Sequence, residues 1–331
     1  MTSADRESTG LQTGTVPVDR PRPHGRVVAV GSLNADLLLT TDEVPQAGRT
    51  VYATALHRAP GGKSANQAVA AARLGATVSL IGAVGSDENG RALMDAALAA
   101  GVDVSGVTTL QGVDSGVAVI LVEPGGENRI LVVGGANRAL DSTHVSAHAE
   151  SLRSAQAVGL SFEVADAPLT TAARIARDAG AIVVLNPSPV RPLTAELADC
   201  VSVLVVNQHE LQAVVGDSTD AARALRTDEL AGLEALVVTR GPDGADVVQR
   251  TSSGGITTTR VPSVEVDAVD TTGCGDAFLG ALLAGLSSGW TLVASARIAA
   301  MVAARAATIS GAQPSYPTWA DLLREHAAPV D

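Results

Sequence analysis

The feature that most constrains the fold is an alternation between short β-branched runs and longer Ala/Leu segments with helical spacing. From Val27 onward, strand-like runs such as VVAVGS, TVSLIGAVG, AVGLSF, AIVVLNP, VSVLVVN and ALVVTRG recur along the chain. Between them, helices are expected over 64–74, 89–100 and 167–179, and two more within 275–310. This alternation is typical of βαβ units, which place helices on both faces of a mostly parallel sheet. The sequence therefore predicts an α/β fold, in which ligands bind beyond the carboxyl ends of the strands.

Two stretches interrupt the alternation, around 37–58 and 103–133. They lack helical spacing, and the second carries the runs SGVAVILVE and RILVVGG around a Pro124-Gly125-Gly126 turn. Such runs predict a small β-sheet that projects from the main sheet. Residues 1–25 are polar and rich in Pro and Gly, a composition that cannot bury enough apolar surface to become ordered. We therefore expect a disordered tail over 1–25 and one large domain over 26–320.

Composition and charge exclude several classes of protein. A chain of 331 residues is long enough for its own core, but 23 basic against 35 acidic side chains argue against a nucleic-acid binder. Two cysteines, Cys200 and Cys274, are too few for a disulfide framework and favour a reducing compartment. The start MTSADRESTG lacks the pattern of a signal peptide, and no apolar run reaches the ~20 residues of a membrane span. We expect a cytoplasmic protein with no nucleic-acid or membrane partner.

The strongest motif is DTTGCGD at 270–276, directly before the apolar helical run FLGALLAGL. Gly273 and Gly275 allow a tight turn that exposes successive N–H groups, and the helix dipole adds its positive end there. Asp276 in the first helical turn could by itself be an ordinary stabilising carboxylate. Beside an anion hole, it would also suit phosphoryl transfer to an alcohol, which needs a base for the hydroxyl proton.

A second motif, APGGKSANQ at 59–67, contains the only lysine of the chain. It is not a P-loop, because position 57, where that motif needs glycine, is His57. Gly61 and Gly62 permit close backbone approach at a helix start, where Lys63 and Asn66 can donate to a polar ligand.

A third motif, GSLNAD at 31–36, follows the first strand. Asn34 and Asp36 point the same way if the chain stays extended, which suits vicinal hydroxyls, but a simple turn is equally compatible. The segments NQHE at 207–210 and TRGPDG at 239–244 each follow a strand and are also compatible with plain cap and turn chemistry.

Taken together, these segments resemble the PfkB family of carbohydrate kinases over about residues 27–318. The resemblance rests on GSLNAD, GGKSANQAVAAARLGA, SGVAVILVEPGGENRI, GGANRAL, LNPSPVRPL, NQHEL, VVTRGPDG, DTTGCGD and GAQPSYP, in the family's order. It implies the ribokinase-like three-layer α/β/α fold, with the inserted strands as a lid that covers the sugar and pairs with the lid of a second subunit in a homodimer. It also implies ATP-dependent phosphorylation of D-ribose at its 5-hydroxyl to give D-ribose 5-phosphate. Nucleoside or other sugar kinases, acting on adenosine, deoxyribose or fructose, are the alternative.

The resemblance also assigns roles to single residues. Asp276 would be the general base, with the amides of Gly273, Cys274 and Gly275 as the anion hole. The positions that hold the sugar match Asn34, Asp36, Gly61, Gly62, Lys63, Asn66 and Glu163, together with Asp276. ATP would be bound by Asn207, Thr239, Arg240, Gly241, Pro242, Asp243 and Gly244, together with Gly275 and Asp276. Glu210 would act on Mg²⁺ through water, and an activating K⁺ would lie at Asp270, Thr272, Ala306, Ile309, Gly311 and Ser315.

The chain departs from the family pattern at a few positions. GGKGAN is here GGKSAN, with Ser64 at a helix start; the position near the adenine is Ala300; and FEVADAP around Glu163 is longer than usual. Two alternatives stay open: Asp270 as a mere turn former and Cys274 as a redox handle. A third, a silent sugar-binding regulator, would lack the base or the anion hole, and both motifs are present. Only Phe162 and Tyr52 among six aromatic residues fall near the predicted sugar side, which favours a bare sugar over a nucleoside.

Overall fold

A computed structural model describes residues 21–123, 128–216 and 220–326. Most of the predicted tail, residues 1–20, and the Pro124-Gly125-Gly126 turn lie outside these ranges. Arg22 and His24, within the predicted tail, contact the domain: Arg22 Nε donates to the Leu74 carbonyl at 3.4 Å, and the His24 amide donates to Ser288 Oγ at 3.1 Å. None of the helices in the described ranges is long and apolar enough to cross a membrane.

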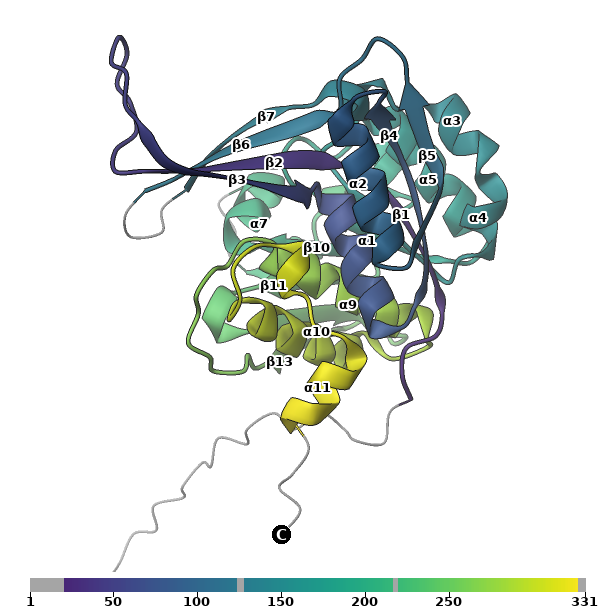
Figure 1. Ribbon diagram of the computed structural model, residues 1–331. Helices are drawn as coiled ribbons and strands as arrows, with labels where there is room; N and C mark the ends of the chain where they lie inside the picture. Colours follow the sequence, from purple (N-terminus) through teal and green to yellow (C-terminus); the bar gives the residue numbers. More distant parts are fainter. Residues whose placement is uncertain (1–20, 124–127, 217–219, 327–331) are drawn as a thin grey trace, which may run out of the picture.

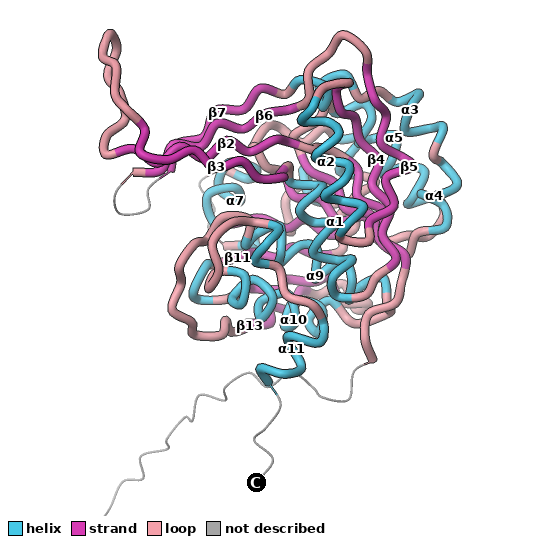
Figure 2. The backbone as a smooth tube through the Cα atoms, viewed as in Figure 1, coloured by secondary structure: helices cyan, strands magenta, loops and turns pink. Residues whose placement is uncertain are grey.

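The central sheet has nine strands in the order β13-β12-β11-β10-β9-β8-β1-β4-β5. Figure 2 shows strands, in magenta, lying among the helices, in cyan, in the body of the molecule. Its strands are β1 (Arg26–Val30), β4 (Thr77–Gly85), β5 (Val102–Leu110), β8 (Ala157–Ser161), β9 (Ile182–Asn186), β10 (Val203–Asn207), β11 (Ala235–Thr239), β12 (Ala245–Arg250) and β13 (Ile256–Val261). Pairing is parallel from β5 to β11 and antiparallel from β11 to β13. The predicted mostly parallel sheet is confirmed.

The strand order reverses beside β1. The chain first builds outward through β4 and β5, then returns to the other side of β1 with β8 and continues to β9, β10 and β11. In open α/β sheets, ligands bind in the crevice at such a reversal, outside the carboxyl ends of the strands. The segments directly after β1 and β8, which begin at Gly31 and Phe162, therefore start at the expected site.

Helices cover both faces of this sheet. They are α1 (Lys63–Leu74), α2 (Glu88–Ala99), α3 (Ser142–Ala147), α4 (Ala149–Ser154), α5 (Asp166–Asp178), α6 (Ala195–Ala198), α7 (Gln208–Val215), α8 (Ala221–Ala224), α9 (Cys274–Ser287), α10 (Leu292–Ala306) and α11 (Trp319–His326). Short 3₁₀ turns lie at η1 (Gly135–Ala139), η2 (Asp228–Leu230), η3 (Gly241–Asp243) and η4 (Gln313–Ser315). Successive residues of β1 alternate between two buried clusters: Val27 packs with α1, α9 and α10, and Val28 packs with α5. Two cores, one on each face, thus make the three layers.

A separate four-stranded sheet projects from one side of the body (Figure 1). It has the order β3-β2-β6-β7 and consists of β2 (Asn34–Thr41), β3 (Ala53–Gly61), β6 (Gly116–Val122) and β7 (Asn128–Val133). Of the stretch expected to form the lid around 103–133, only β6 and β7 belong to this sheet, because residues 102–110 pair with β4 as the edge strand of the main sheet. The alternating pattern of those residues suits either sheet, so the sequence could not separate them.

Candidate active site

Glu163, in the turn after β8, accepts hydrogen bonds from polar groups in the segments that follow β1. Its Oε2 accepts hydrogen bonds from Ser32 Oγ, from Asn34 Nδ2 at 3.3 Å and from the backbone N–H of Lys63 at 3.1 Å. Three predicted sugar residues from distant segments are thereby brought together at the strand-order reversal. Ser32 was not predicted, and nothing in its sequence surroundings distinguishes it from the other residues of the turn.

The amide of Asn34 is oriented by a residue that the sequence did not single out. Asn137, buried in η1, donates from Nδ2 to Asn34 Oδ1 at 2.8 Å and to the Leu33 carbonyl at 3.0 Å. Its Oδ1 accepts from the Leu33 amide at 3.0 Å. With its oxygen thus engaged, Asn34 presents its amide N–H groups to Glu163. The signal available in the sequence was the motif GGANRAL, which contains Asn137 and is part of the resemblance to the PfkB family.

Asp36 lies on β2 two residues beyond Asn34, so the extended chain expected for this pair is confirmed. A Cβ added at Gly61, on the neighbouring strand β3, would lie 2.1 Å from Asp36 Oδ2, so the carboxylate occupies the space that a side chain at 61 would fill. Burial, and then the charges of Glu163 and Asp276, raise the pKa of Asp36 to about 7, against the opposing charge of Lys63. The folded protein therefore holds the Asp36 proton to a higher pH than the unfolded chain does.

Asp276 lies in the first turn of α9 and is 92% buried, since its exposed fraction is 8%. Both carboxylate oxygens accept amide donors from α1: Asn66 Nδ2 to Oδ2 at 3.0 Å and Gln67 Nε2 to Oδ1 at 3.3 Å. Gly273 precedes the helix in the left-handed conformation, with φ 74°. Gly275 has its N–H in the first helical turn, where backbone donors lack intrahelical partners. The Cys274 amide donates to the Thr271 carbonyl at 3.2 Å, so of the three predicted anion-hole amides this one already has a partner.

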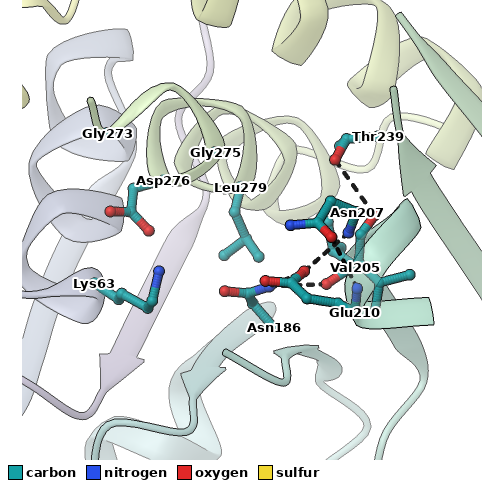
Figure 3. A pocket seen from close by; sticks show the side chains of 11 residues that line it. Lys63, Asn186, Val205, Asn207, Glu210, Thr239, Gly273, Gly275, Asp276 and Leu279 are labelled. Carbon is teal, nitrogen blue, oxygen red and sulfur yellow. Dashed lines mark hydrogen bonds between the residues drawn. The ribbon is translucent and has the colours of Figure 1, made fainter. Parts of the chain in front are cut away.

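Lys63, the only lysine, is half-buried and lies near four carboxylates. Burial alone would lower its pKa, but the charges of Asp276, Glu163, Glu210 and Asp36 raise it above the ordinary value. Figure 3 shows Lys63 and Asp276 on one side of a pocket, with Glu210 and Asn186 across from them. The lysine is therefore a fixed positive charge in a site otherwise rich in carboxylates.

This pocket has a volume of about 170 Å³ and lies between α9 and the ends of β9, β10 and β11. The predicted Asn207 and Glu210 line it, and they also form a capping box for α7: the Glu210 amide donates to Asn207 Oδ1 at 2.8 Å, and the Asn207 amide to Glu210 Oε2 at 2.9 Å. The cap interpretation of NQHE is confirmed, and the same two residues line the pocket, where their role toward Mg²⁺ and phosphates stays a prediction. Asn186, at the end of β9, was missed; its Nδ2 donates to the Val205 carbonyl at 3.0 Å.

A larger cavity of about 730 Å³ adjoins the first, sharing Thr239 and Gly275. Of the predicted nucleotide loop, Thr239, Gly241, Pro242 and Gly244 line it. Arg240 instead pairs with Asp246, Nε to Oδ2 at 2.6 Å, and the Asp243 carbonyl accepts from Arg260 at 2.5 Å. These contacts make Arg240 and Asp243 parts of the loop's scaffold.

The opposite wall of the larger cavity is formed by the loop 263–268 and by α10. Ala300 lines it, together with residues that the sequence did not indicate: Ala303 and Ala304 on α10 and Ala307 directly after it. The spacing of these alanines at i, i+3, i+4 and i+7 was the available signal, but small residues at that spacing are more often core. The alanines present only methyl groups to the cavity, whereas the loop adds the polar Ser263 and Glu265.

The predicted potassium segments lie against each other. The Ala307 carbonyl accepts from the amides of Val269 at 2.7 Å and Asp270 at 3.1 Å. Asp270 accepts from the amides of Thr272 at 2.9 Å and Gly311 at 2.8 Å; burial raises its pKa, but these hydrogen bonds outweigh burial and lower it. These hydrogen bonds tie the turn at 270–272 to Gly311, and the potassium role of Asp270 stays a prediction. For Cys274, burial and then the charges of Asp270 and Asp276 raise the pKa to about 11, which disfavours the reactive thiolate of a redox handle.

Comparison with known proteins defines the class of this site. Residues 25–319 match the family "pfkB family carbohydrate kinase", and the chain belongs to that family. It is 34% identical over 294 residues to a ribokinase of Bacillus subtilis, covering 88% of this chain and 96% of the relative. It is 33% identical over 300 residues to a deoxyribokinase of Salmonella typhi, covering 88% and 95%. The structure of Arabidopsis thaliana ribokinase complexed with ribose and ATP superposes with a TM-score of 0.84 at 28% identity, covering 92% and 99%.

Proposed function

We propose that this protein is an ATP-dependent kinase that phosphorylates D-ribose at its 5-hydroxyl to give D-ribose 5-phosphate. The observation that carries the proposal is the place of Asp276. Its buried carboxylate is near enough to Asp36, in the polar group with Asn34 and Glu163, to raise the pKa of that residue. The same carboxylate lines the smaller pocket, which adjoins the larger cavity. An alcohol bound on one side and a phosphate on the other would meet at this carboxylate.

In this mechanism, Asp276 accepts the proton of the sugar's primary hydroxyl, and the oxygen attacks the γ-phosphate of ATP with ADP as leaving group. The N-terminus of α9 points its N–H groups at the charge that develops on the phosphoryl oxygens. Lys63, fixed on the same pocket, adds a positive charge. Phosphoryl transfer depends mainly on such positioning and charge stabilisation, because the protein contributes little covalent chemistry.

The polar set on the sugar side supports a bare sugar with adjacent hydroxyls. Asn34 offers N–H donors, Asp36 and Glu163 offer acceptors, and each buried group left unpaired costs about 1–3 kcal/mol. Asn34 and Asp36 lie two residues apart on one strand, a spacing that suits a vicinal diol. Ribose has such a diol at carbons 2 and 3, whereas 2-deoxyribose lacks it, and this favours ribose over the deoxy sugar.

The smaller pocket fits Mg²⁺ brought in with ATP. Within the described ranges, no three His, Cys, Asp or Glu side chains are grouped to hold a metal ion. Mg²⁺ commonly keeps several waters and is held by one or two carboxylates plus substrate phosphates, so a dedicated cage is not needed. Glu210, which lines this pocket, would take this role through water, and the ion would neutralise charge on the phosphates.

We also propose that K⁺ binds where the segments 270–272 and 306–315 adjoin, held by several backbone carbonyls among the positions Asp270, Thr272, Ala306, Ile309, Gly311 and Ser315. The hydrogen bonds from Val269 and Asp270 to Ala307 bring these segments together, which supports the placement. The segment 270–272 leads directly into Gly273 at the start of α9, so this site would steady the anion hole.

A second copy of the chain is proposed to pair with the projecting sheet. Four successive residues of its edge strand β7, Ile130–Val133, are each more than half exposed, as is Leu56 on the other edge strand β3. An exposed apolar edge strand is a ready template for pairing with another sheet.

The cytoplasmic location expected from the sequence stays a prediction.

The experiment that tests the proposed activity is ATP consumption and product identification with ribose, 2-deoxyribose, fructose and adenosine. We expect the highest kcat/KM with ribose and phosphate on its 5-oxygen. A preference for adenosine or 2-deoxyribose would overturn the choice of ribose, and turnover of none of them would overturn the kinase assignment.

A further inference from the structure

Gln67, the residue after Asn66 on α1, is held beside Asp276 in a way that packing alone does not explain. Its side chain is fully buried, and its Nε2 donates to Asp276 Oδ1 at 3.3 Å. Its Oε1 is buried without a hydrogen-bond partner in the part of the chain that the structure describes. An unpaired buried acceptor destabilises a fold, and an apolar side chain of similar shape would avoid that cost. We therefore take the hydrogen bond from Gln67 Nε2 to Asp276 as the function of this side chain.

The other carboxylate oxygen has a matching donor whose orientation is also fixed. Gln313 in η4 donates from Nε2 to Asn66 Oδ1 at 3.0 Å, and Asn66 Nδ2 donates to Asp276 Oδ2 at 3.0 Å. Because the amide oxygen of Asn66 is engaged by Gln313, its nitrogen must face the carboxylate. Two amide donors thus fix both oxygens of Asp276, and a carboxylate with about four lone-pair sites keeps room for the proton of a substrate hydroxyl.

The close contact of α1 and α9 brings these groups together. Gly280 lies one turn after Asp276 on the same face of α9, and a Cβ added there would lie 2.4 Å from the Gln67 carbonyl and 2.6 Å from Ala70 Cβ. Glycine at position 280 lets α1 and α9 approach closely enough for the Gln67 side chain to reach the Asp276 carboxylate.

We propose that Gln67 is a positioning residue for the phosphoryl transfer: with Asn66 and Gln313 it fixes the orientation of the Asp276 carboxylate. This inference rests on the proposed function only in taking Asp276 as the base. The Gln67 side chain contacts Asp276 and is not one of the predicted sugar-binding residues. Replacing it should therefore lower the rate of phosphoryl transfer without changing the affinity for the sugar. Gln313 acts through Asn66, which is a predicted sugar residue, so its loss should change both.

The test compares Gln67→Met and Gln67→Leu with the wild-type full chain. We expect kcat to fall by about 10- to 100-fold, since misplacement of a catalytic group by about 1 Å costs a factor near the upper value. The KM for the sugar should stay within about twofold, and the unfolding temperature should be equal or higher, because the unpaired Oε1 is removed. Gln313→Met should lower kcat and also raise KM. The matched control is Gln156→Met, the same change at a residue whose Oε1 accepts from the Arg26 amide far from the site, and it should leave kcat unchanged.

Two results would overturn the inference: a kcat within about twofold of wild type in both Gln67 variants, or a lower unfolding temperature in both. The wild-type sugar panel is measured first and separates this question from the proposed function. If another sugar replaces ribose as the substrate, the choice of ribose fails, and the same variants are compared on that sugar.

Discussion

A single methyl group at Gly61 should weaken sugar binding without unfolding the protein. In Gly61→Ala the added Cβ would lie 2.1 Å from Oδ2 and 2.4 Å from Cγ of Asp36, well inside van der Waals contact. The backbone at Gly61 is not in the left-handed region, so alanine itself is tolerated there. The carboxylate is the end of a side chain with freedom to rotate, so it should swing away. The fold should then lose about 1 kcal/mol or less, below the usual range for a forced overpacking of a rigid core.

The loss should appear in the KM for ribose. Hydrogen bonds to a charged group contribute about 1.5–3 kcal/mol, which corresponds to a rise in KM of about 10- to 150-fold. The assay is steady-state kinetics with a coupled measurement of ADP, alongside thermal unfolding. Gly232→Ala is the matched control, because the nearest atoms to its added Cβ lie at 3.4 Å, an ordinary contact. A KM for ribose within twofold of wild type in folded Gly61→Ala would refute the placement of Asp36 against the sugar.

Three further predictions concern pH, the monovalent cation and the lid. Burial and the charges of Glu163 and Asp276 raise the pKa of Asp36 from 3.8 to about 7, so the unfolded chain gives up this proton at lower pH than the folded protein. This group should therefore reduce stability as pH rises from about 4 to 7, and Asp36→Asn should remove that slope from a series of unfolding temperatures. Replacing K⁺ by Na⁺ should lower kcat, and equal rates in both salts would contradict the site at 270–272 and 306–315. Leu131→Lys on β7 should convert dimers to monomers in sedimentation, whereas the control Leu98→Lys, at a leucine on α2 that is also more than half exposed, should not.

The fold was predictable where the signal is local. The alternation of β-branched and helical segments predicted β1, β4, β8, β9, β10 and β11 and the helices α1, α2 and α5 to within a residue or two, because each element buries a face whose period is visible in the sequence. It also predicted two helices within 275–310, where α9 and α10 lie. The division between β5 and the small sheet was not predictable, since an alternating strand does not show which sheet it joins.

The site was predictable where glycines and polar residues follow a strand or begin a helix, as at Asn34, Gly61 and Asp276. It was not predictable where a residue acts through a partner far along the chain. Gln67 and Asn137 look like ordinary polar residues of a helix and a turn, and their contacts with Asp276 and Asn34 span 209 and 103 positions. Only the folded chain brings such partners together.

The most direct test of the central claim is the rate of ribose 5-phosphate formation by Asp276→Asn, measured together with ribose binding by calorimetry. Asparagine keeps the shape of the side chain but cannot accept the proton. The proposed mechanism predicts that kcat falls by about 10²- to 10⁴-fold, as expected for loss of a general base, while ribose affinity changes by no more than a few fold. A kcat within tenfold of wild type would contradict the role of Asp276 and with it the proposed mechanism.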